Sequence, residues 1–266
     1  MADQTLAAVA AQSLAATPHR TRVFEHAGRR YVAKRLAERP RRLLQTLFMR
    51  WLVKRVTGQP LPLRTLSLSE AASSMDYEAN RLEALAAGGV RVPLVAYRCP
   101  EFFVLEHCGD VVSAQLERWQ RDEWRPQLVV LARELGEFHR AGHWHGGAQI
   151  KNITLRDGIA TRIDFEENFG EFLPRPVTQA TDLVLFLNSI SLAGPIDEAE
   201  ARALLPQLLA AYATANPDTA VRDVIARALP WLRRLVAAAR PFRRWSRKGI
   251  RRVEILADLL GDWLKR

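Results

Sequence analysis

One stretch near the middle of the chain constrains its fold and its chemistry more than any other. His145 begins the run His-Gly-Gly-Ala-Gln-Ile-Lys-Asn, which ends at Asn152, and Asp164 follows twelve residues later within Arg-Ile-Asp-Phe-Glu. Between them, two short apolar segments flank Asp157-Gly158, which predicts a β-hairpin with Asn152 and Asp164 at its open ends. An amide oxygen and a carboxylate that meet in this way are hard ligands of the kind Mg²⁺ prefers.

Four other features precede or follow this stretch. Lys34 ends the strand-like run Tyr-Val-Ala-Lys, and Glu78 lies on a predicted helix. Glu106 and Cys108 belong to the run Leu-Glu-His-Cys-Gly at the end of a predicted strand, and Asp182 lies in a predicted helix beyond the hairpin. Each residue alone has an ordinary structural explanation, but their order and spacing form one pattern.

That pattern resembles the protein kinases, whose catalytic loop reads H-x-D-x-x-x-x-N and is followed about a dozen residues later by D-F-G. The resemblance covers roughly residues 20–190. It is closest to the small atypical kinases, namely the Kdo and heptose lipopolysaccharide kinases, the RIO and KEOPS-complex kinases and the aminoglycoside phosphotransferases.

The resemblance implies an ATP site with Mg²⁺. Lys34 would bind the α and β phosphates and pair with Glu78, and the backbone of Glu106 and Cys108 would hold adenine. Asn152 and Asp164 would bind the metal. Asp182 would hold the backbone of the catalytic loop, in which His145 has a structural role.

The chain departs from the family pattern at two places. Gly147 stands where the catalytic-base aspartate falls, and glycine can neither accept a proton nor orient a hydroxyl. The glycine-rich loop before the first hairpin is also missing. The expected phosphate loop, 15–20, has no glycine, so Thr17, His19 and Arg20 are the candidates to contact phosphate there.

Two residues of the same loop favour retained activity. Lys151 lies four residues after position 147, an offset that carries a γ-phosphate cation in tyrosine kinases and HipA-type kinases. Gln149 could orient an acceptor hydroxyl. Because the transition state of phosphoryl transfer is loose, a base contributes less here than in acyl transfer, and activity without the aspartate is consistent with the chemistry.

The order of predicted elements indicates an α+β fold with two unequal lobes. We expect one protein-kinase-like domain over residues 1–266, with a β-containing N-lobe at 1–110 and a mainly helical C-lobe at 111–266. The predicted elements are a hairpin over 21–36, helices over 41–56, 75–87 and 127–141, strands over 91–97 and 101–107, and helices from residue 180 onward with breaks at Gly194-Pro195, Asn216-Pro217, Pro230 and Pro241.

Composition excludes several classes of protein. The 266 residues are 48% hydrophobic, enough for a substantial core, and the two cysteines have no metal-ligand or C-x-x-C spacing. The amino-terminal residues show no signal-peptide pattern, and no apolar run reaches the roughly 18–20 residues of a membrane span. These features favour a reduced, cytoplasmic setting.

The net charge of +10 is concentrated near the two ends of the sequence: residues 1–60 carry +9, residues 231–266 carry +8, and the rest carries −7. The predicted helix over 41–56 combines arginines with an apolar stripe that includes Leu43, Leu47, Phe48 and Trp51, as interfacial membrane helices do. The second basic segment, 233–252, suits anionic lipid, lipopolysaccharide phosphates or RNA. Packed or solvated helices explain both segments equally well.

The sequence thus predicts an ATP-dependent phosphotransferase of the lipopolysaccharide-kinase type at the cytoplasmic surface of the inner membrane. Its partners would be ATP and an anionic membrane surface or lipopolysaccharide, with a protein substrate as an alternative and nucleic acid less favoured. Gly147 keeps a second interpretation open, a nucleotide-binding pseudokinase that acts as an interaction module. A small RIO- or KEOPS-like serine/threonine kinase is the third.

Overall fold

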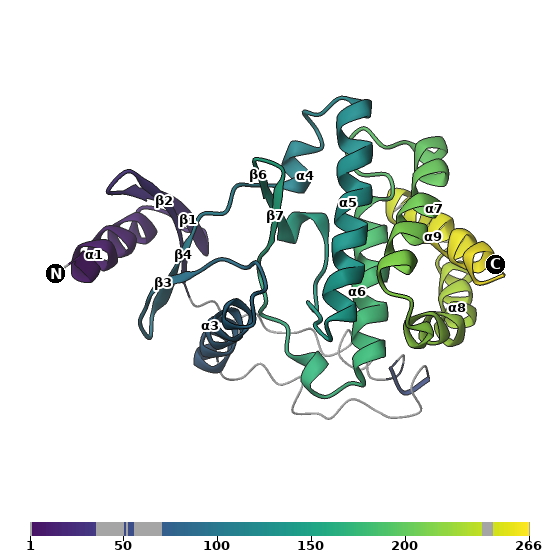
Figure 1. Ribbon diagram of the computed structural model, residues 1–266, viewed down its shortest axis with the longest axis horizontal. Coiled ribbons are helices and arrows are strands. Elements are labelled where there is room, and N and C mark those ends of the chain that lie inside the picture. Colours follow the sequence, from purple (N-terminus) through teal and green to yellow (C-terminus); the bar gives the residue numbers. More distant parts are fainter. Residues whose placement is uncertain (1, 36–50, 52, 56–70, 241–246, 266) are drawn as a thin grey trace.

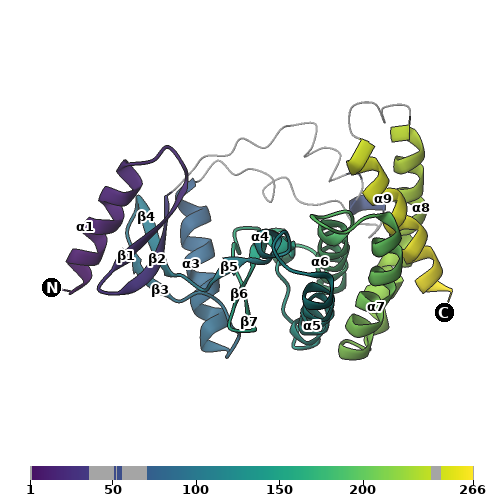
Figure 2. The same ribbon diagram turned by 90° about the horizontal axis from the view of Figure 1, so that it is seen from above.

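The computed structural model describes residues 2–35, 51, 53–55, 71–240 and 247–265, and these form two unequal lobes (Figure 1). The small lobe contains a four-stranded sheet with a helix on either side. The large lobe is mainly helical, and the two ends of the chain lie at opposite ends of the molecule (Figures 1 and 2). This is the expected α+β architecture with an N-lobe and a C-lobe.

The N-lobe sheet has the strand order β1-β2-β4-β3 and is antiparallel throughout. The predicted first hairpin is confirmed, because β1 pairs with β2 around Ala27-Gly28, whose φ angles of 49° and 73° suit a tight hairpin turn. Lys34 lies near the end of β2, opposite Phe103 on β4. The strands are β1 (Thr21–His26), β2 (Arg29–Arg35), β3 (Val95–Arg98) and β4 (Phe102–Glu106).

Helices α1 (Ala2–Ala15) and α3 (Ala71–Ala87) lie on opposite sides of this sheet (Figure 2). Leu6, Ala10 and Leu14 recur every four residues on α1 and pack on the sheet with Phe24 and other apolar residues. The sequence analysis did not anticipate α1. The other helix, α3, begins four residues before its predicted start and ends at Gly88-Gly89 as expected.

The C-lobe begins with a second, three-stranded sheet of order β5-β6-β7, which places the two ends of the predicted hairpin beside the N-lobe. The strand β5 and the short helix α4 were not predicted. The C-lobe elements are β5 (Asp110–Val111), α4 (Val112–Gln115), α5 (Arg121–Arg140), η2 (Ile150–Asn152), β6 (Ile153–Arg156), β7 (Ile159–Arg162), η3 (Phe169–Glu171), α6 (Arg175–Ile190), α7 (Glu198–Ala215), α8 (Thr219–Ala239) and α9 (Arg247–Leu264).

Several predicted boundaries in the C-lobe were wrong. Helix α5 begins six residues before the predicted start, because a capping box between Gln120 and Glu123 starts it ahead of Pro126. Pro230 does not break α8, which continues through it to Ala239. A proline removes one backbone hydrogen bond, and the apolar face of α8, buried against α6 and α9, keeps the helix continuous. The breaks at Gly194-Pro195 and Asn216-Pro217 are confirmed.

The predicted helix over 41–56 lies mostly outside the described residues, as do Leu43, Leu47, Phe48 and the break at Pro241. Trp51 packs edge-on against Trp231 of α8 with ring centroids 5.3 Å apart, and the Arg55 guanidinium lies 5.1 Å from the Trp231 ring. Val53 is buried. For this end of the helix, the contacts favour packing on the C-lobe over a membrane-facing stripe.

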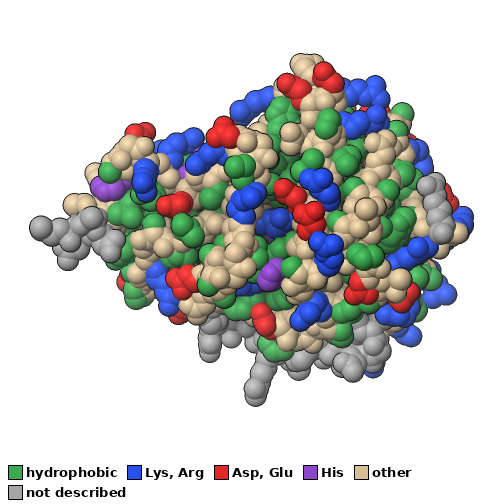
Figure 3. All heavy atoms as spheres, viewed as in Figure 1, with side chains coloured by type: hydrophobic (Ala, Val, Ile, Leu, Met, Phe, Trp, Pro, Cys, Tyr) green, Lys and Arg blue, Asp and Glu red, His purple; other side chains and the backbone are tan. Residues whose placement is uncertain are grey.

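None of the helices among the described residues is long and apolar enough to cross a bilayer. On the face seen in Figure 3, lysine and arginine side chains alternate with aspartate and glutamate and do not form one continuous basic area.

The close packing of α5 on α7 provides a test of the C-lobe. A Cβ added at Gly136 would lie 2.7 Å from the Tyr212 carbonyl oxygen and 2.8 Å from Ala215 Cβ. We expect Gly136→Ala to destabilise the protein by about 1–3 kcal/mol in urea unfolding, although alanine is the better helix former. The control Gly88→Ala, whose Cβ would come no closer than 3.4 Å to its neighbours, should be near neutral. Equal stability of the two variants would contradict this packing.

Candidate functional site

A buried lysine from the N-lobe sheet lies at the centre of the candidate site. Lys34 Nζ donates to both oxygens of Glu78, on α3, at 2.8 and 2.7 Å. It also donates to Asp164 Oδ1, just after β7, at 2.5 Å. Lys34 and Glu78 are 5% and 1% exposed, so this ion pair is held away from water. The structure therefore brings together three residues that the sequence analysis had singled out.

Burial and the neighbouring charges shift the pKa values of Lys34, Glu78 and Asp164. Burial opposes the charge on Lys34, but Glu78, Asp164 and Glu166 outweigh it and raise the pKa of the ammonium group. Burial also raises the pKa of Glu78, and Lys34 only partly offsets this effect. For Asp164, burial is the largest single influence and raises the pKa, but Lys34, His145 and Arg20 together outweigh it, so the pKa is lowered and the carboxylate is ionised.

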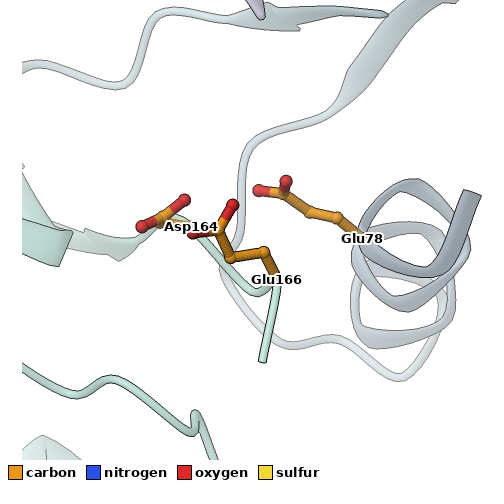
Figure 4. Close-up of side chains that lie close together, drawn as sticks. All are labelled: Glu78, Asp164 and Glu166. Carbon is orange, nitrogen blue, oxygen red and sulfur yellow. The ribbon is translucent and has the colours of Figure 1, made fainter. Parts of the chain in front are cut away.

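Glu166 is a third carboxylate of the cluster that the sequence analysis did not single out. It lies two residues after Asp164, and its Oε2 is 3.7 Å from Lys34 Nζ and 2.6 Å from Arg20 Nη1. Figure 4 shows the carboxylates of Glu78, Asp164 and Glu166 turned toward one another from α3 and from the segment after β7. One oxygen of each lies within 4.8 Å of the others. In the sequence, the spacing Asp-x-Glu from Asp164 to Glu166 was the feature that could have indicated this third carboxylate.

The predicted metal ligands, Asn152 and Asp164, both line a cleft of about 490 Å³ between the lobes. Asn152 is 9% exposed, and its side-chain amide donates to the Gly147 carbonyl at 2.9 Å, which fixes the direction of the Oδ1 atom. Among the described residues, nothing donates to that oxygen. Asp164 has a φ of 68°, a left-handed conformation that aspartate tolerates better than most residues. An amide oxygen with an unused lone pair and an ionised carboxylate, both on one cleft, fit Mg²⁺.

The segment predicted to hold adenine forms the rim of the same cleft. The Glu106 N–H donates to the Leu94 carbonyl, and the His107 N–H donates to the Arg30 carbonyl. The Cys108 N–H donates to no protein atom within the described part of the chain, and Cys108 lines the cleft beside Glu106. Apolar walls come from Val23, Val32, Leu105 and Ile163 of both lobes. This combination of a backbone donor and apolar side chains suits a purine base.

The loop from His145 to Asn152 is held by side chains behind it. Asp182, on α6, is fully buried and accepts hydrogen bonds from the His145 and Gly146 N–H groups at 2.6 and 2.8 Å. This is the contact expected for Asp182. The His145 ring stacks on Phe165 at 4.3 Å between centroids, and its Nε2 lies 2.9 Å from the Ile163 carbonyl oxygen. His145 thus joins the loop to the segment that carries Asp164.

Arg81 makes a further contact between the lobes that the sequence did not suggest. From α3 it donates to the carbonyl oxygens of Trp144, His145 and Glu167, and its guanidinium lies 3.5 Å from the centroid of the Trp144 ring. An arginine one turn after Glu78 offers no motif, so only the folded structure shows this role.

Gly147 does not have a positive φ, so its backbone does not require glycine. A Cβ there would lie 3.4 Å from Asn152 Nδ2 and 3.8 Å from His145 Nδ1, which are ordinary contacts. Lys151 is exposed on η2 and forms no ion pair within the described part of the chain, and Gln149 is half-buried. Neither is among the described residues that line the cleft. The structure therefore places both beside position 147 but outside the cluster around Lys34.

A second cavity, of about 200 Å³, lies among α6, α8 and α9 and is lined by apolar side chains such as Val184, Leu229 and Leu260. Among the described residues that line it, none has an ionisable side chain.

No family model matches this chain, and no curated protein does. Among solved structures, one that matches is the gentamicin–APH(2'')-IIa complex, which aligns over 90% of each chain with 11% identity and a TM-score of 0.41.

Four features define the fold class of this protein: the sheet with its lysine, the helix with the paired glutamate, the cleft, and the helical lobe. It has a two-lobed, protein-kinase-like α+β fold, as the sequence predicted.

The buried imidazole of His145 predicts a pH dependence of stability. Burial, with help from Arg162 and Arg81, lowers its pKa to about 4, against about 6.5 in an unfolded chain. Between these values the unfolded state binds a proton that the folded state does not, so stability falls as the pH drops from about 6.5 toward 4. The contribution of this group is at most roughly 3 kcal/mol.

We expect His145→Gln to remove this contribution. Free energies of unfolding, measured in urea between pH 4.5 and 6.5, should rise less steeply with pH for the variant. The slope gives the number of protons taken up on unfolding, and that number should fall by up to about one. Parallel slopes for the two proteins would show that His145 is not held neutral in the fold.

Proposed function

We propose that this protein is an ATP- and Mg²⁺-dependent phosphotransferase that works without a carboxylate at the usual base position. The observation that carries the proposal is the buried Lys34–Glu78 pair, in direct contact with Asp164. A buried ion pair gains little stability over apolar packing, so its place at the wall of a cleft is better explained by anion and metal binding.

Each residue of the cleft would have a distinct role. Lys34 would contact the α and β phosphates and Glu78 would hold its ammonium in place. Asn152 Oδ1 and Asp164 would bind Mg²⁺, which neutralises phosphate charge and fixes the geometry of the γ-phosphoryl group. The Cys108 N–H and the Glu106 carbonyl would bind the adenine edge. Lys151 would stabilise charge on the γ-phosphate during transfer.

The proposed phosphoryl acceptor lies at a membrane surface. The resemblance to lipopolysaccharide kinases and the basic end regions favour an acceptor at an anionic cytoplasmic membrane surface, while the packing of Trp51 on Trp231 argues against a membrane-facing role for that tryptophan. A protein acceptor, as in RIO- or KEOPS-like kinases, is the alternative.

A pseudokinase that binds nucleotide and acts as an interaction module is the second candidate function. Gly147 favours it, because no other side chain within the described residues takes the place of the base. His145 is close, but its pKa is lowered to about 4 and its Nδ1 accepts from the Gly147 N–H. Asp182 is already bound to two backbone amides.

Nucleotide binding is tested by thermal unfolding. At about ten times the dissociation constant, Mg-ATP should add about 1.4 kcal/mol of stability, or roughly 3–6 °C in melting temperature. Asp164→Asn should abolish the shift that depends on Mg²⁺. The matched control Asp157→Asn, at the exposed tip of the β6–β7 turn, should retain it. No shift for the wild type at millimolar Mg-ATP would refute both candidate functions that require nucleotide.

Gly147→Asp tests catalysis without a base. Because position 147 has an ordinary φ and room for a Cβ, the variant should fold with near wild-type stability. A general base contributes about 10²–10⁴-fold, so the variant should transfer phosphate to a hydroxyl acceptor faster than the wild type. A single-turnover assay with labelled ATP, scoring transfer to the protein itself or to extracted lipopolysaccharide, measures the rate.

The same assay separates enzyme from pseudokinase. In an enzyme, Lys151→Ala should lower the transfer rate while the Mg-ATP melting shift remains, since the γ-phosphate charge is met mainly in the transition state. Arg133→Ala, at an exposed cation outside both basic end regions, should have no effect. If wild type and Lys151→Ala both show only background hydrolysis, the pseudokinase function replaces the enzyme.

A further inference from the structure

Arg20 lies where the missing glycine-rich loop would contact phosphate. It ends the connection between α1 and β1 and lines the cleft together with Lys34, Asn152 and Asp164. Its side chain is 16% exposed, and Nη1 donates to Glu166 Oε2 at 2.6 Å. Since Lys34 Nζ is 3.7 Å from that same oxygen, two cations face one carboxylate oxygen.

The backbone around Arg20 is held in place by its neighbours. Arg35 N donates to the Arg20 carbonyl at 2.9 Å, and Arg20 Nε donates back to the Arg35 carbonyl at 3.3 Å. Arg35 also donates to the Leu14 and Thr17 carbonyl oxygens. These contacts fix the direction of the guanidinium, so it is pre-organised toward the cleft rather than free to turn into solvent.

The other two candidates of this connection have different surroundings. The Thr17 hydroxyl accepts from the His19 N–H at 3.2 Å within the turn, and His19 is exposed. Among the described residues that line the cleft, Arg20 is the one that this connection contributes. It therefore carries the phosphate-binding role that the sequence had shared among three residues.

The balance of charge shows why Glu166 matters. Arg20 and Lys34 face the three carboxylates Glu78, Asp164 and Glu166, which leaves this group of five with a net negative charge. A phosphate that approaches Arg20 meets the Glu166 carboxylate on the same guanidinium. A divalent cation beside Asp164 and Glu166 would neutralise this competitor and release the guanidinium, whose planar fork suits phosphate oxygens.

We propose that Arg20 binds the nucleotide phosphates in place of a glycine-rich loop, and that the Glu166 carboxylate competes with them for Arg20 until a divalent cation neutralises it. The inference rests on the proposed nucleotide binding and adds a competing ion pair, Arg20–Glu166, to that site. Phosphate binding becomes dependent on the metal through Glu166, in addition to direct coordination by Asn152 and Asp164.

A bridge that is only structural would also join Arg20 to Glu166, and the two explanations predict opposite effects of Glu166→Gln. If Glu166 competes with phosphate, removing its charge strengthens metal-free phosphate binding. If the bridge only holds the lobes together, removing the charge loosens the cleft and weakens binding, with or without metal.

The experiment is calorimetric titration of the whole protein with inorganic tripolyphosphate and with ATP, each with and without Mg²⁺. Arg20→Gln should weaken tripolyphosphate binding about tenfold or more, as expected for loss of a charge-assisted contact. Glu166→Gln should strengthen metal-free tripolyphosphate binding several-fold and reduce the gain on adding Mg²⁺. Arg22→Ala, on the exposed part of β1, is the matched control and should behave as the wild type.

Arg20→Lys guards against a folding defect in Arg20→Gln. It keeps the charge but loses the fork, so its affinity for tripolyphosphate should fall between those of Arg20→Gln and the wild type. Wild-type affinity in Arg20→Lys and Arg20→Gln, or weaker metal-free binding by Glu166→Gln, overturns the inference. Failure of the proposed function gives a different result. In that case the wild type itself does not show the Mg-ATP binding that Asp164→Asn is expected to remove.

Discussion

The ammonium group of Lys34 lies where three segments of the chain meet, and much of the site depends on it. Strand β2 supplies the lysine, α3 supplies Glu78, and the segment after β7 supplies Asp164. Desolvating these charges costs several kcal/mol, which their mutual attraction offsets only when the geometry is good. Removal of the lysine would leave buried carboxylates without a cation, so the two lobes keep their alignment partly because this charge must be matched.

The loop that carries Gly147 is fixed independently of the residue at that position. Asp182 accepts from two of its amides, and Arg81 donates from the N-lobe to the carbonyl oxygens of Trp144 and His145 at its start. The His145 ring joins it to Phe165 and Ile163. A loop held from both lobes retains its backbone path when one side chain is absent. This explains how Asn152 and Asp164 keep their places on the cleft although position 147 has no side chain.

The parts of this arrangement that sequence could predict are those encoded by short-range spacing. The first hairpin, the D-G turn between Asn152 and Asp164, and the order of Lys34, Glu78 and Asp182 each follow from local pattern, and the structure brings these residues to one cleft or its support. The resemblance to protein kinases added two contacts between distant residues, Lys34 with Glu78 and Asp182 with the loop. Distant contacts outside that family pattern were not predictable: Arg20 and Glu166 are 146 positions apart, and Arg81 and Trp144 are 63 apart. The course of α8 through Pro230 was also missed, because tertiary packing outweighs the local effect of one proline.

The conformation at position 147 decides whether the backbone itself requires a glycine there. Where a glycine has positive φ or touches a neighbour closely, as Gly146 does against Glu167, the backbone itself excludes other residues. Gly147 has neither constraint, so the fold would accept an aspartate at this position. A phosphoryl transfer with a loose transition state depends first on positioning and charge neutralisation, which Lys34, Asn152 and Asp164 are placed to provide. The base is then the component whose loss costs least. The cleft keeps Lys34, its paired Glu78 and the two expected metal ligands, so a slow enzyme and a nucleotide-binding module both fit it.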